Sequence, residues 1–410
     1  MWKPELLAPA KNLERLKVAI TYGADAVYVG GQKYGLRARA DNFSDYDLEH
    51  GVNFAHKNNA KVYLTLNAFL HDDDFEGLAE YCQFLESIGV DGVIVSDLGV
   101  LRVVKNSSNL DIHLSTQASC LNSYAGQMWK EFAVKRLIVG REVSVAEGGL
   151  IRRQTGIDVE MFIHGAMCMA FSGNCTISNF TAGRDSNRGG CIQSCRFPYQ
   201  LEAKTDNQAV TFMSSKDLWG IHQVGAFFEQ QVCSLKIEGR MKSSFYVAMT
   251  CRAYRQAIDA YAEGRLTPEL VNQISSELES VPHRDYSSAS LETPAGNDSV
   301  YKQLESSRGT HEYLGIVMET TAENIVLQLV ESVEVGDEIE IIPVSGEIVR
   351  WRVSQLISVV GDRLEKMRAG NVVCIPKTAA PDILNNVAKL NIVRMPPFKN
   401  LEFRMREFRI

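Results

Sequence analysis

Four of the nine cysteines of this chain lie within 28 residues, in two pairs: Cys168 with Cys175, and Cys191 with Cys195. Thiolates are the strongest soft-metal ligands that a protein offers. Because the chain shows no sign of export, cysteines clustered in this way favour a metal or iron–sulfur site over disulfide bonds. We therefore expect this stretch to bind a metal centre that the surrounding elements must position.

The spacing of the four cysteines indicates the kind of metal centre. A structural zinc site usually shows Cys-x2-Cys or similarly tight pairs, whereas this chain has Cys-x6-Cys followed by Cys-x3-Cys. The looser spacing favours a four-iron cluster held by Cys168, Cys175, Cys191 and Cys195, with zinc second and unliganded cysteines as the remaining alternative. Cys233 is a rival fourth ligand, but it precedes an expected strand and should lie near the opposite end of the fold.

Eight short apolar runs rich in Val, Ile and Leu recur over the first 240 residues, and helix-like segments separate them. Strands that alternate with helices pair in parallel, and eight of them in about 250 residues predict a TIM-type (β/α)8 barrel. An open doubly wound sheet is the structural alternative. The runs are 6–8, 26–29, 62–66, 92–95, 111–114, 136–139, 159–163 and 234–237.

In such a barrel the residues that follow each strand form a reactive rim. The cysteine stretch follows the seventh run, so it is expected to form a long insertion, residues 164–233, on that rim. Loops this long inside compact domains are usually functional or ordered by something else, and a metal cluster can supply that order. Other rim positions include Asn67, Ser115, Arg141 and Arg240, although any strand end meets water and carries polar groups.

The pattern changes after the expected barrel, which we assign to residues 1–282. Residues 283–310 are polar and contain clusters of Ser, Pro and Gly, which is typical of a linker. Between residues 311 and 397 several apolar runs alternate with period two and are separated by turns. This pattern predicts a small antiparallel β-barrel, and residues 398–410 are left as a tail.

The composition limits the classes of partner. The 410 residues are 45% hydrophobic and 23% charged, as in a globular protein. No stretch approaches the roughly 20 apolar residues that span a membrane, and the N-terminus lacks the apolar run of a signal peptide, so we expect a cytoplasmic protein without a membrane partner. The net charge of −7 argues against a general basic coat, but residues 168–260 hold ten Lys and Arg against seven Asp and Glu, which leaves room for a local basic patch.

One sequence signature in the chain resembles that of a known family. The run Glu160-Met-Phe-Ile-His-Gly-Ala-Met-Cys168, followed after four residues by Gly173-Asn-Cys-Thr-Ile-Ser178, is similar throughout to the signature of the collagenase-like U-32 peptidases. Segments 5–10, 184–191 and 234–243 support the resemblance. It covers residues 1 to about 285, and the strand-rich end looks like the extra domain of longer members.

The resemblance implies two different activities. The family name implies a peptidase, whereas members of similar length and motif set are tRNA hydroxylation proteins that help to form 5-hydroxyuridine at the wobble position, with prephenate implicated as a co-substrate. Other relatives hydroxylate ribosomal RNA or a quinone precursor without dioxygen. Some carry a four-iron cluster on cysteines of this region, so the same four cysteines are the implied ligands; relatives do not all use the same four, and Cys233 stays open as a substitute.

The residue types favour the hydroxylase over the peptidase. A peptidase needs an activated nucleophile or a metal-bound water, and the sequence has no His-Glu-x-x-His helix and no Gly-x-Ser-x-Gly elbow. His164 and Glu160 are the only suggestive pair near the cysteines; four residues apart in a strand, they would share a face but lie too far apart for a direct bond. Glu160, His164 and Arg141 are therefore candidates for orienting a substrate or moving protons.

A hydroxylase that acts on RNA needs a redox centre, cations for phosphate and a pocket that accepts a splayed base. We expect tRNA as the substrate, an electron-donor protein as a further partner and the C-terminal barrel as an aid in gripping tRNA. A scaffold whose cluster is purely structural is a third hypothesis. The expected RNA-binding residues, for each of which ordinary solvated charge is the alternative, are Arg184, Arg188, Arg196, Lys236, Arg240 and Lys242.

Overall fold

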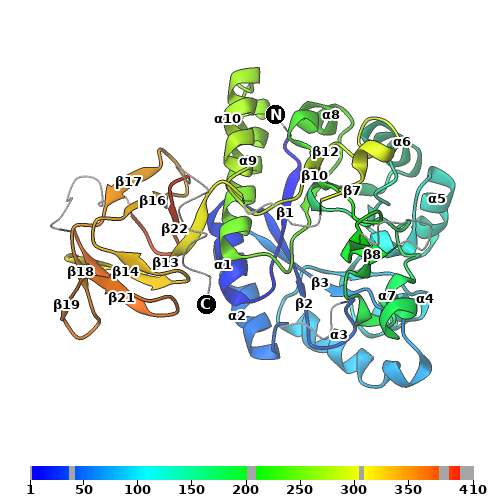
Figure 1. Ribbon diagram of the computed structural model, residues 1–410. Coiled ribbons are helices and arrows are strands. Elements are labelled where there is room, and N and C mark those ends of the chain that lie inside the picture. The colour runs from blue at the N-terminus through cyan, green and yellow to red at the C-terminus, as the bar shows by residue number, and fades with distance from the viewer. Residues whose placement is uncertain (1, 37–41, 201–208, 304–308, 378–386, 398–410) are drawn as a thin grey trace.

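Eight parallel strands form a ring. Each strand pairs with the next along the chain, and the last, β11, pairs with both β7 and β1 (Figure 1). This closure confirms the TIM-type barrel and excludes the open sheet. The structure, a computed structural model, describes residues 2–36, 42–200, 209–303, 309–377 and 387–397. The ring strands are β1 (Glu5–Pro9), β2 (Ala26–Gly30), β3 (Lys61–Leu66), β4 (Gly92–Val95), β5 (Asp111–Leu114), β6 (Arg136–Ile138), β7 (Asp158–Ala166) and β11 (Ser234–Ile237).

The ring strands form because their residues are mostly apolar and are buried on both faces, as in parallel sheets covered by helices. Every residue of β2 and of β4 is buried. Val27, Leu64 and Val93 are 0% exposed. The few charged residues in these strands pair with one another inside the ring.

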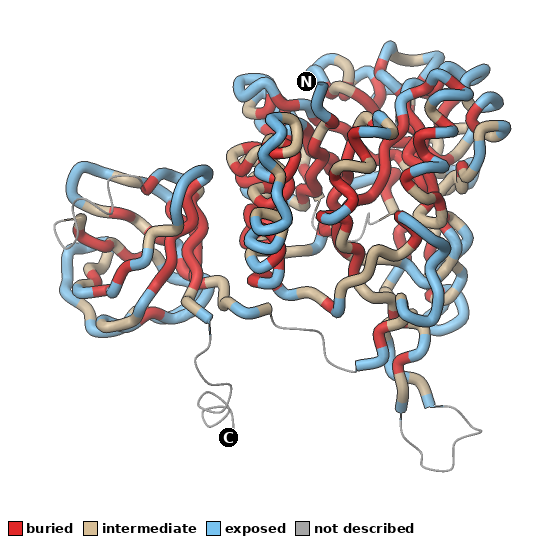
Figure 2. The backbone as a smooth tube through the Cα atoms, turned by 90° about the horizontal axis from the view of Figure 1, so that it is seen from above, coloured by how far each residue is buried: buried red, intermediate tan, exposed pale blue. Residues whose placement is uncertain are grey.

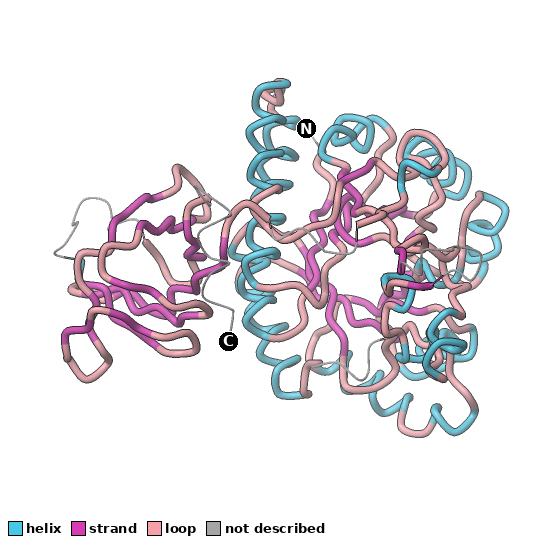
Figure 3. The backbone as a smooth tube through the Cα atoms, in the orientation of Figure 1, coloured by secondary structure: helices cyan, strands magenta, loops and turns pink. Residues whose placement is uncertain are grey.

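Helices cover the outside of the ring (Figure 3). Ser44, Asp97, Ser144 and Ser243 begin four of them, because each side chain accepts a hydrogen bond from the backbone of the first turn. No helix within the described ranges combines the length and the apolar character that crossing a membrane requires. The helices are α1 (Leu13–Thr21), α2 (Asp45–Lys57), α3 (Leu78–Ser87), α4 (Leu98–Ser107), α5 (Ser123–Glu131), α6 (Val145–Thr155), α7 (Ile177–Ala182), α8 (Val224–Glu229), α9 (Ser244–Ala262) and α10 (Pro268–Leu278), with short turns η1 (Asp72–Phe75), η2 (Thr116–Ala118), η3 (Ser186–Gly190), η4 (Ser194–Arg196), η5 (Ile221–Gln223) and η6 (Asn297–Ser299).

The connection between β7 and β11 carries the cysteines and leaves the ring at the carboxyl end of β7. It contains α7, the antiparallel pair β8 (Tyr199–Gln200) and β9 (Ala209–Val210), and then β10 (Asp217–Trp219). In Figure 2 the middle of this connection, at β8 and β9, projects beyond the barrel. β10 runs antiparallel to β7, and β12 (Tyr286–Ser287) pairs beside β10, so part of the stretch expected as a linker extends the barrel sheet.

The C-terminal part is an antiparallel sheet that forms a half-barrel, so the expected small antiparallel barrel is confirmed in its antiparallel pairing, whereas the described residues do not close it. Pairing runs from β17 at one edge to β19 at the other, and the described residues show no pairing between these two edges. Period-two alternation fixes which face of each strand is buried, but it does not determine whether the edges of a sheet meet. Residues 398–410 lie outside the described part. The strands are β13 (Glu312–Thr320), β14 (Asn324–Leu329), β16 (Glu338–Ile342), β17 (Val349–Arg352), β18 (Leu356–Ile357), β19 (Arg363–Leu364), β21 (Val372–Pro376) and β22 (Ile392–Met395), with a separate pair β15 (Val333–Glu334) and β20 (Lys366–Met367).

The two parts of the chain share a buried interface on α1 and α9. Ile316, Ile342 and Ile392 of the C-terminal sheet belong to the hydrophobic core of the barrel. The hydroxyl of Tyr22, which is 1% exposed, donates to the carbonyl oxygen of Ile342 over 2.7 Å and accepts from the backbone N–H of Ile392 over 2.9 Å. The ring of Phe245 stacks on Tyr313 at 5.7 Å between centroids. The sheet is therefore docked on the barrel.

We predict that Tyr22→Phe lowers the free energy of unfolding by about 1–3 kcal/mol, because the loss of one hydroxyl leaves a buried carbonyl and a buried N–H without partners. Urea denaturation measures the change. Tyr124→Phe is the matched control, since Tyr124 lies on α5 and is 86% exposed, and its effect should stay within about 0.5 kcal/mol. Equal stability of the two variants would contradict the role given to Tyr22.

Candidate functional site

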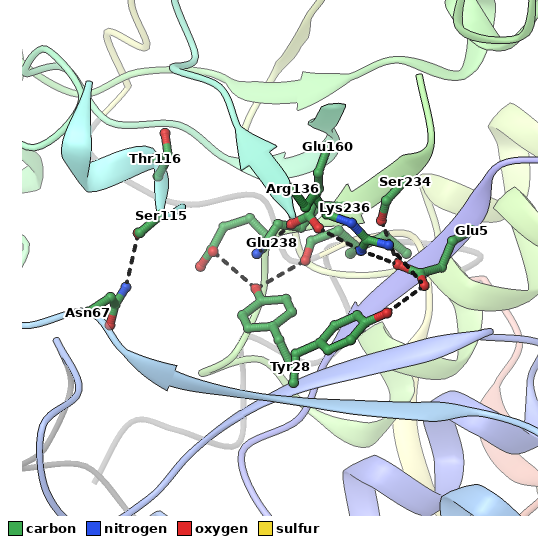
Figure 4. A network of polar contacts seen from close by, with 12 residues as sticks. Glu5, Tyr28, Asn67, Ser115, Thr116, Arg136, Glu160, Ser234, Lys236 and Glu238 are labelled. Atoms are coloured by element: carbon green, nitrogen blue, oxygen red, sulfur yellow. Dashed lines mark hydrogen bonds and ion pairs between the residues drawn. The ribbon is translucent and has the colours of Figure 1, made fainter. Parts of the chain in front are cut away.

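Polar side chains gather at the carboxyl ends of the ring strands, in a group that we call the mouth and define by Thr65, Asn67, Ser115, Glu238 and Arg240. The amide of Asn67 donates to the Ser115 hydroxyl over 3.4 Å, and a guanidinium N–H of Arg240 donates to the Thr65 hydroxyl over 3.3 Å. These contacts link β3, the segments after β3 and β5, and the segment after β11. Figure 4 shows Asn67, Ser115 and Glu238 on the same side of the ring interior.

Deeper in the ring lies a buried network of opposite charges. The carboxylate of Glu160, which is 0% exposed, accepts from Lys236 over 2.8 Å and from Arg136 over 3.1 Å. Arg136 also pairs with Glu5 over 2.7 Å, and the hydroxyl of Ser234 donates to Glu5 over 2.9 Å (Figure 4). Burial opposes the charge of Arg136, but Glu5 and Glu160 outweigh it and raise its pKa. Glu160 is thus held as a buried counter-ion in the ring.

A short chain of side-chain contacts connects this network to the mouth. Lys236 lies over the ring of Tyr28 at 4.3 Å, and the Tyr28 hydroxyl donates to the carboxylate of Glu238 over 3.2 Å and to the carbonyl oxygen of Ile237 over 3.1 Å. The same ammonium group pairs with Glu160. The charge of Glu238 at the mouth is therefore linked to the buried ion pairs by one tyrosine.

His164 lies on the other side of the barrel wall. Phe162 pairs with Lys236 and His164 pairs with Ile237, so Ile163 is an extra residue in β7, and this irregularity reverses the side-chain direction beyond it. The expectation that Glu160 and His164 share a face is therefore wrong. The rings of Tyr246, Tyr254 and Tyr286 surround His164, and its Nδ1 lies 3.1 Å from the Tyr254 hydroxyl.

The buried environment of His164 favours its neutral form. The residue is 1% exposed, and burial lowers the pKa of its imidazole to about 3. Its Nε2 has no hydrogen-bond partner among the described residues. His164 is therefore a neutral, buried side chain that packs α9 and β12 against β7.

The Cys-rich insertion, residues 168–200, is fastened to the rim by polar contacts. The N–H and the hydroxyl of Ser172 both donate to the carboxylate of Glu142, over 3.0 Å each. The hydroxyl oxygen of Ser172 accepts from the N–H of Arg141 over 3.2 Å. Gly173 has a φ of +78°, and a Cβ there would lie 1.9 Å from the carbonyl oxygen of Gln117, so only glycine allows this approach. The N–H of Phe69 donates to the carbonyl oxygen of Asn187 over 3.2 Å.

Inside the insertion, hydroxyl and amide groups hold the chain together in place of an apolar core. The hydroxyl of Thr181 on α7 donates to that of Ser194 over 2.7 Å, and the hydroxyls of Ser178 and Ser194 lie 3.4 Å apart. The N–H of Ser178 donates to the hydroxyl of Ser186 over 3.2 Å, and the amide of Asn187 donates to the carbonyl oxygen of Cys175 over 3.0 Å. These contacts tie α7, η3 and η4 to the cysteine-bearing loops.

The four clustered thiols are neighbours. All four cysteines are free, with Cys168 and Cys191 exposed and Cys175 and Cys195 partly exposed. Burial raises the pKa of the Cys195 thiol, and the other three thiols raise it further. Within the described ranges, no three His, Cys, Asp or Glu side chains are grouped so that they could hold a single metal ion. The thiols thus lie close enough to interact but do not converge on one ion.

Cys233 lies elsewhere. Its N–H donates to the carbonyl oxygen of Val159 over 2.8 Å, and its own carbonyl oxygen accepts from the N–H of Glu5 over 2.8 Å. These partners stand at the amino ends of β7 and β1, so the thiol lies at the end of the ring opposite the mouth, as its place in the sequence predicted. Burial raises its pKa, and the nearby Arg136 opposes that effect.

Two of the six expected RNA-binding cations already have carboxylate partners. Arg188 pairs with Asp74 on η1, which fastens the insertion to the segment after β3. Lys236 pairs with Glu160 deep in the ring and is 5% exposed. Lys236 is therefore not available to RNA phosphate in this structure.

Two other expected cations, Arg196 and Lys242, lie beside a charge cluster that the sequence did not reveal. Arg284 pairs with Asp217, and the two are 7% and 2% exposed. Burial, and then the repulsion from Arg284, lowers the pKa of Arg196. Burial also lowers the pKa of Lys242, whose ammonium donates to the carbonyl oxygen of Pro282 over 3.0 Å.

The remaining candidates stand at or near the mouth. Arg240 is one of its defining residues, and the guanidinium of Arg141 lies over the ring of Phe162 at 4.1 Å. Arg184 begins the turn after α7, where its N–H donates to the carbonyl oxygen of Ser178 over 3.1 Å. The structure therefore brings Arg141 to the rim with the cysteine insertion and Arg240 to the mouth, while Glu160 is held in the buried ion pairs and His164 among tyrosine rings.

The comparisons with known proteins agree on one family. The model of "Peptidase family U32" matches residues 11–300. The chain is 41% identical over 350 residues to "tRNA hydroxylation protein P1" of Bacillus subtilis, covering 82% of this chain and 83% of that protein. It is 38% identical over 266 residues to "23S rRNA 5-hydroxycytidine C2501 synthase" of Escherichia coli, covering 64% and 40%, and 32% identical over 301 residues to "Collagenase" of Porphyromonas gingivalis, covering 69% and 72%.

The match to the family model spans most of the barrel and includes the cysteine insertion, the mouth and the network strands β6, β7 and β11, while β1 lies before it. The similarity to the Bacillus relative extends over more than four fifths of both chains. On these grounds the chain belongs to peptidase family U32.

Proposed function

We propose that this protein hydroxylates RNA, and that its substrate is the wobble uridine of a tRNA, which becomes 5-hydroxyuridine. The observation that carries the proposal is the gathering of four free thiols on a hydrogen-bonded insertion at the mouth of the barrel. The mouth is where TIM barrels place their chemistry. Relatives named for tRNA and rRNA hydroxylation support the choice of substrate class.

The proposal includes an iron–sulfur cluster on Cys168, Cys175, Cys191 and Cys195. Replacing C5–H by C5–OH adds one oxygen atom to the uridine and removes two electrons from it. The change balances if a hydroxyl-bearing co-substrate R–OH gives up its oxygen, accepts the two electrons and becomes R–H. When bound, the cluster would carry electrons between the two. The donor set fits in its chemistry, because four free cysteines share one insertion and cysteine thiolates are the ligands that hold iron–sulfur clusters.

In this proposal prephenate is the co-substrate for the transfer of oxygen and electrons, and dioxygen is not required. Prephenate carries two carboxylates, and guanidinium groups bind carboxylates through paired hydrogen bonds. The guanidinium of Arg141 lies at the rim, and that of Arg240, which is 6% exposed, lies at the mouth. In this proposal they orient the co-substrate, and the carboxylate of Glu238 at the mouth, which accepts from Tyr28, moves a proton.

The peptidase alternative has less support in the geometry. Its name comes from the family and from a relative called collagenase. The pair that suggested it, Glu160 and His164, lies on opposite sides of the barrel wall, with Glu160 in ion pairs and His164 enclosed by tyrosine rings. Neither side chain can activate a nucleophile for the other.

We predict that Cys175→Ser, and likewise Cys168→Ser, removes the iron and abolishes formation of 5-hydroxyuridine. Each replaces a thiolate ligand by a hydroxyl, which binds iron weakly. The measurements are iron and sulfide analysis after anaerobic purification, and nucleoside analysis of tRNA from cells that carry the variant.

Cys233→Ser is the matched control for the cysteine variants. Because Cys233 lies at the opposite end of the ring, this variant should keep its iron and its activity. Full iron loading and activity in Cys175→Ser would refute the ligand assignment, and loss of iron in Cys233→Ser would make Cys233 a ligand.

We predict that Arg184→Gln weakens tRNA binding and lowers the slope of log affinity against log salt by about one, as expected for the loss of one phosphate contact. Fluorescence anisotropy at several salt concentrations measures both quantities. Arg102→Gln is the control, because Arg102 is an exposed residue of α4 on the outer layer. An unchanged slope for Arg184→Gln would place the RNA-binding surface elsewhere.

A further inference from the structure

Exposed phenylalanines are concentrated in the part of the chain that carries the cysteines. Of the five phenylalanines that are strongly exposed in the described residues, four lie between residues 171 and 212. Phe180 is 87% exposed and Phe171 is 53% exposed, while Phe197 and Phe212 are each 44% exposed. We call these four residues the aromatic patch. Single exposed apolar residues are common, but the grouping of four exposed rings in the one connection between β7 and β11 needs a cause.

The internal structure of the insertion does not require these rings. Its elements are joined by hydroxyl and amide hydrogen bonds, such as that from Thr181 to Ser194. On α7, Ser178 and Thr181 make hydrogen bonds within the insertion. Phe180, which lies between them in the sequence, leaves its phenyl ring exposed to solvent. Tyr199 has a similar division of roles: its hydroxyl donates to the carbonyl oxygen of Ser194 over 2.7 Å, and its ring meets that of Phe212 at 6.0 Å.

Basic residues outnumber acidic ones within the insertion, where Arg188 is paired with Asp74 of η1 and Ser172 binds Glu142. Residues 168–200 contain three arginines and one acidic residue, Asp185, whose carboxylate accepts from the N–H of Asn187 over 2.9 Å. Arg196 directly precedes Phe197, and Arg184 follows the helix that bears Phe180. Exposed rings interleaved with cations match a chain of phosphates whose bases are unpaired, because every base offers a flat face for stacking. A neutral protein surface would not require the cations.

We infer that the aromatic patch stacks unpaired bases of RNA beside the mouth of the barrel. The inference deepens the proposed function and rests on it, since it names the form of RNA that the site takes. Bases inside a duplex are stacked on each other and cannot lie on a phenyl ring, so the patch selects single-stranded loops. Holding the neighbours of the target base in this way favours the extrusion of that base toward the mouth.

The experiment compares RNA binding by full-length variants. The probes are a hairpin RNA with a seven-nucleotide loop that contains uridine, and a fully paired duplex of the same length and composition. The variants are Phe180→Ala and Phe197→Ala, with Phe180→Trp to restore a stacking face. Tyr124→Ala is the matched control, because Tyr124 is 86% exposed on α5, outside the insertion. Circular dichroism and iron content verify that each variant is folded and loaded.

We expect each Phe→Ala variant to bind the hairpin about 5- to 100-fold more weakly, as stacking energies of single bases imply. The slope of log affinity against log salt should not change, because a phenyl ring contacts no phosphate. Phe180→Trp and Tyr124→Ala should bind like the unmodified protein, and duplex binding should not respond to any variant.

Unchanged hairpin affinity in both Phe→Ala variants, while the unmodified protein binds the hairpin and hydroxylates tRNA, overturns the inference and leaves the proposed function intact. If the unmodified protein neither binds the hairpin nor changes tRNA, both fail together. If the substitutions instead abolish self-association in sedimentation and leave RNA binding unchanged, the patch is an interface between two copies, and the inference is overturned.

Discussion

The buried ion pairs among Glu5, Arg136, Glu160 and Lys236 are the constraint on which the ring depends. Each residue comes from a different strand, β1, β6, β7 and β11, and these include the strands on both sides of the seam where the ring closes. Charges this deeply buried cost several kcal/mol each to desolvate, and the loss of one partner typically costs about 3–5 kcal/mol because the other is left uncompensated. The four side chains therefore tolerate one arrangement of these strands, which fixes the spacing of the mouth above them.

The barrel followed from the sequence because its strands are apolar on both faces and therefore appear as continuous runs. All eight expected runs fall in the eight ring strands. The extra residue at Ile163 in β7 was missed, since a single inserted residue in an apolar run leaves no periodic signal, and this is why His164 was given a place beside Glu160. The prediction that the C-terminal sheet closes into a barrel failed for a related reason. Alternation of apolar and polar residues shows which face of a strand is buried, but it does not show whether the edges of the sheet meet.

The candidate site was predictable where it is local in sequence and not where it is assembled from distant segments. The cysteine pairs and the position of Cys233 could be placed from spacing and order alone. The pairing of Asp217 with Arg284 joins two segments that look like loops in the sequence, and the pairing of Glu5 with Arg136 joins positions 131 residues apart. Charged residues within otherwise apolar runs, such as Arg136 and Lys236, were the available signal, and an interior network is their explanation.

The seam between β1 and β11 also has a consequence for the synthesis of the protein. Ser234 reaches back to Glu5 across 229 residues of chain, so the first strand leaves the ribosome long before its second neighbour exists. Until β11 is made, Glu160 lacks its partner Lys236, and the edges of β1 and β7 that later pair with β11 are unpaired. Unpaired strand edges of this kind can pair with other chains and aggregate. Contacts this distant in sequence also slow folding. The nascent chain must therefore remain shielded until β11 has emerged, and only then can the ring and the cysteine insertion above it acquire their final form.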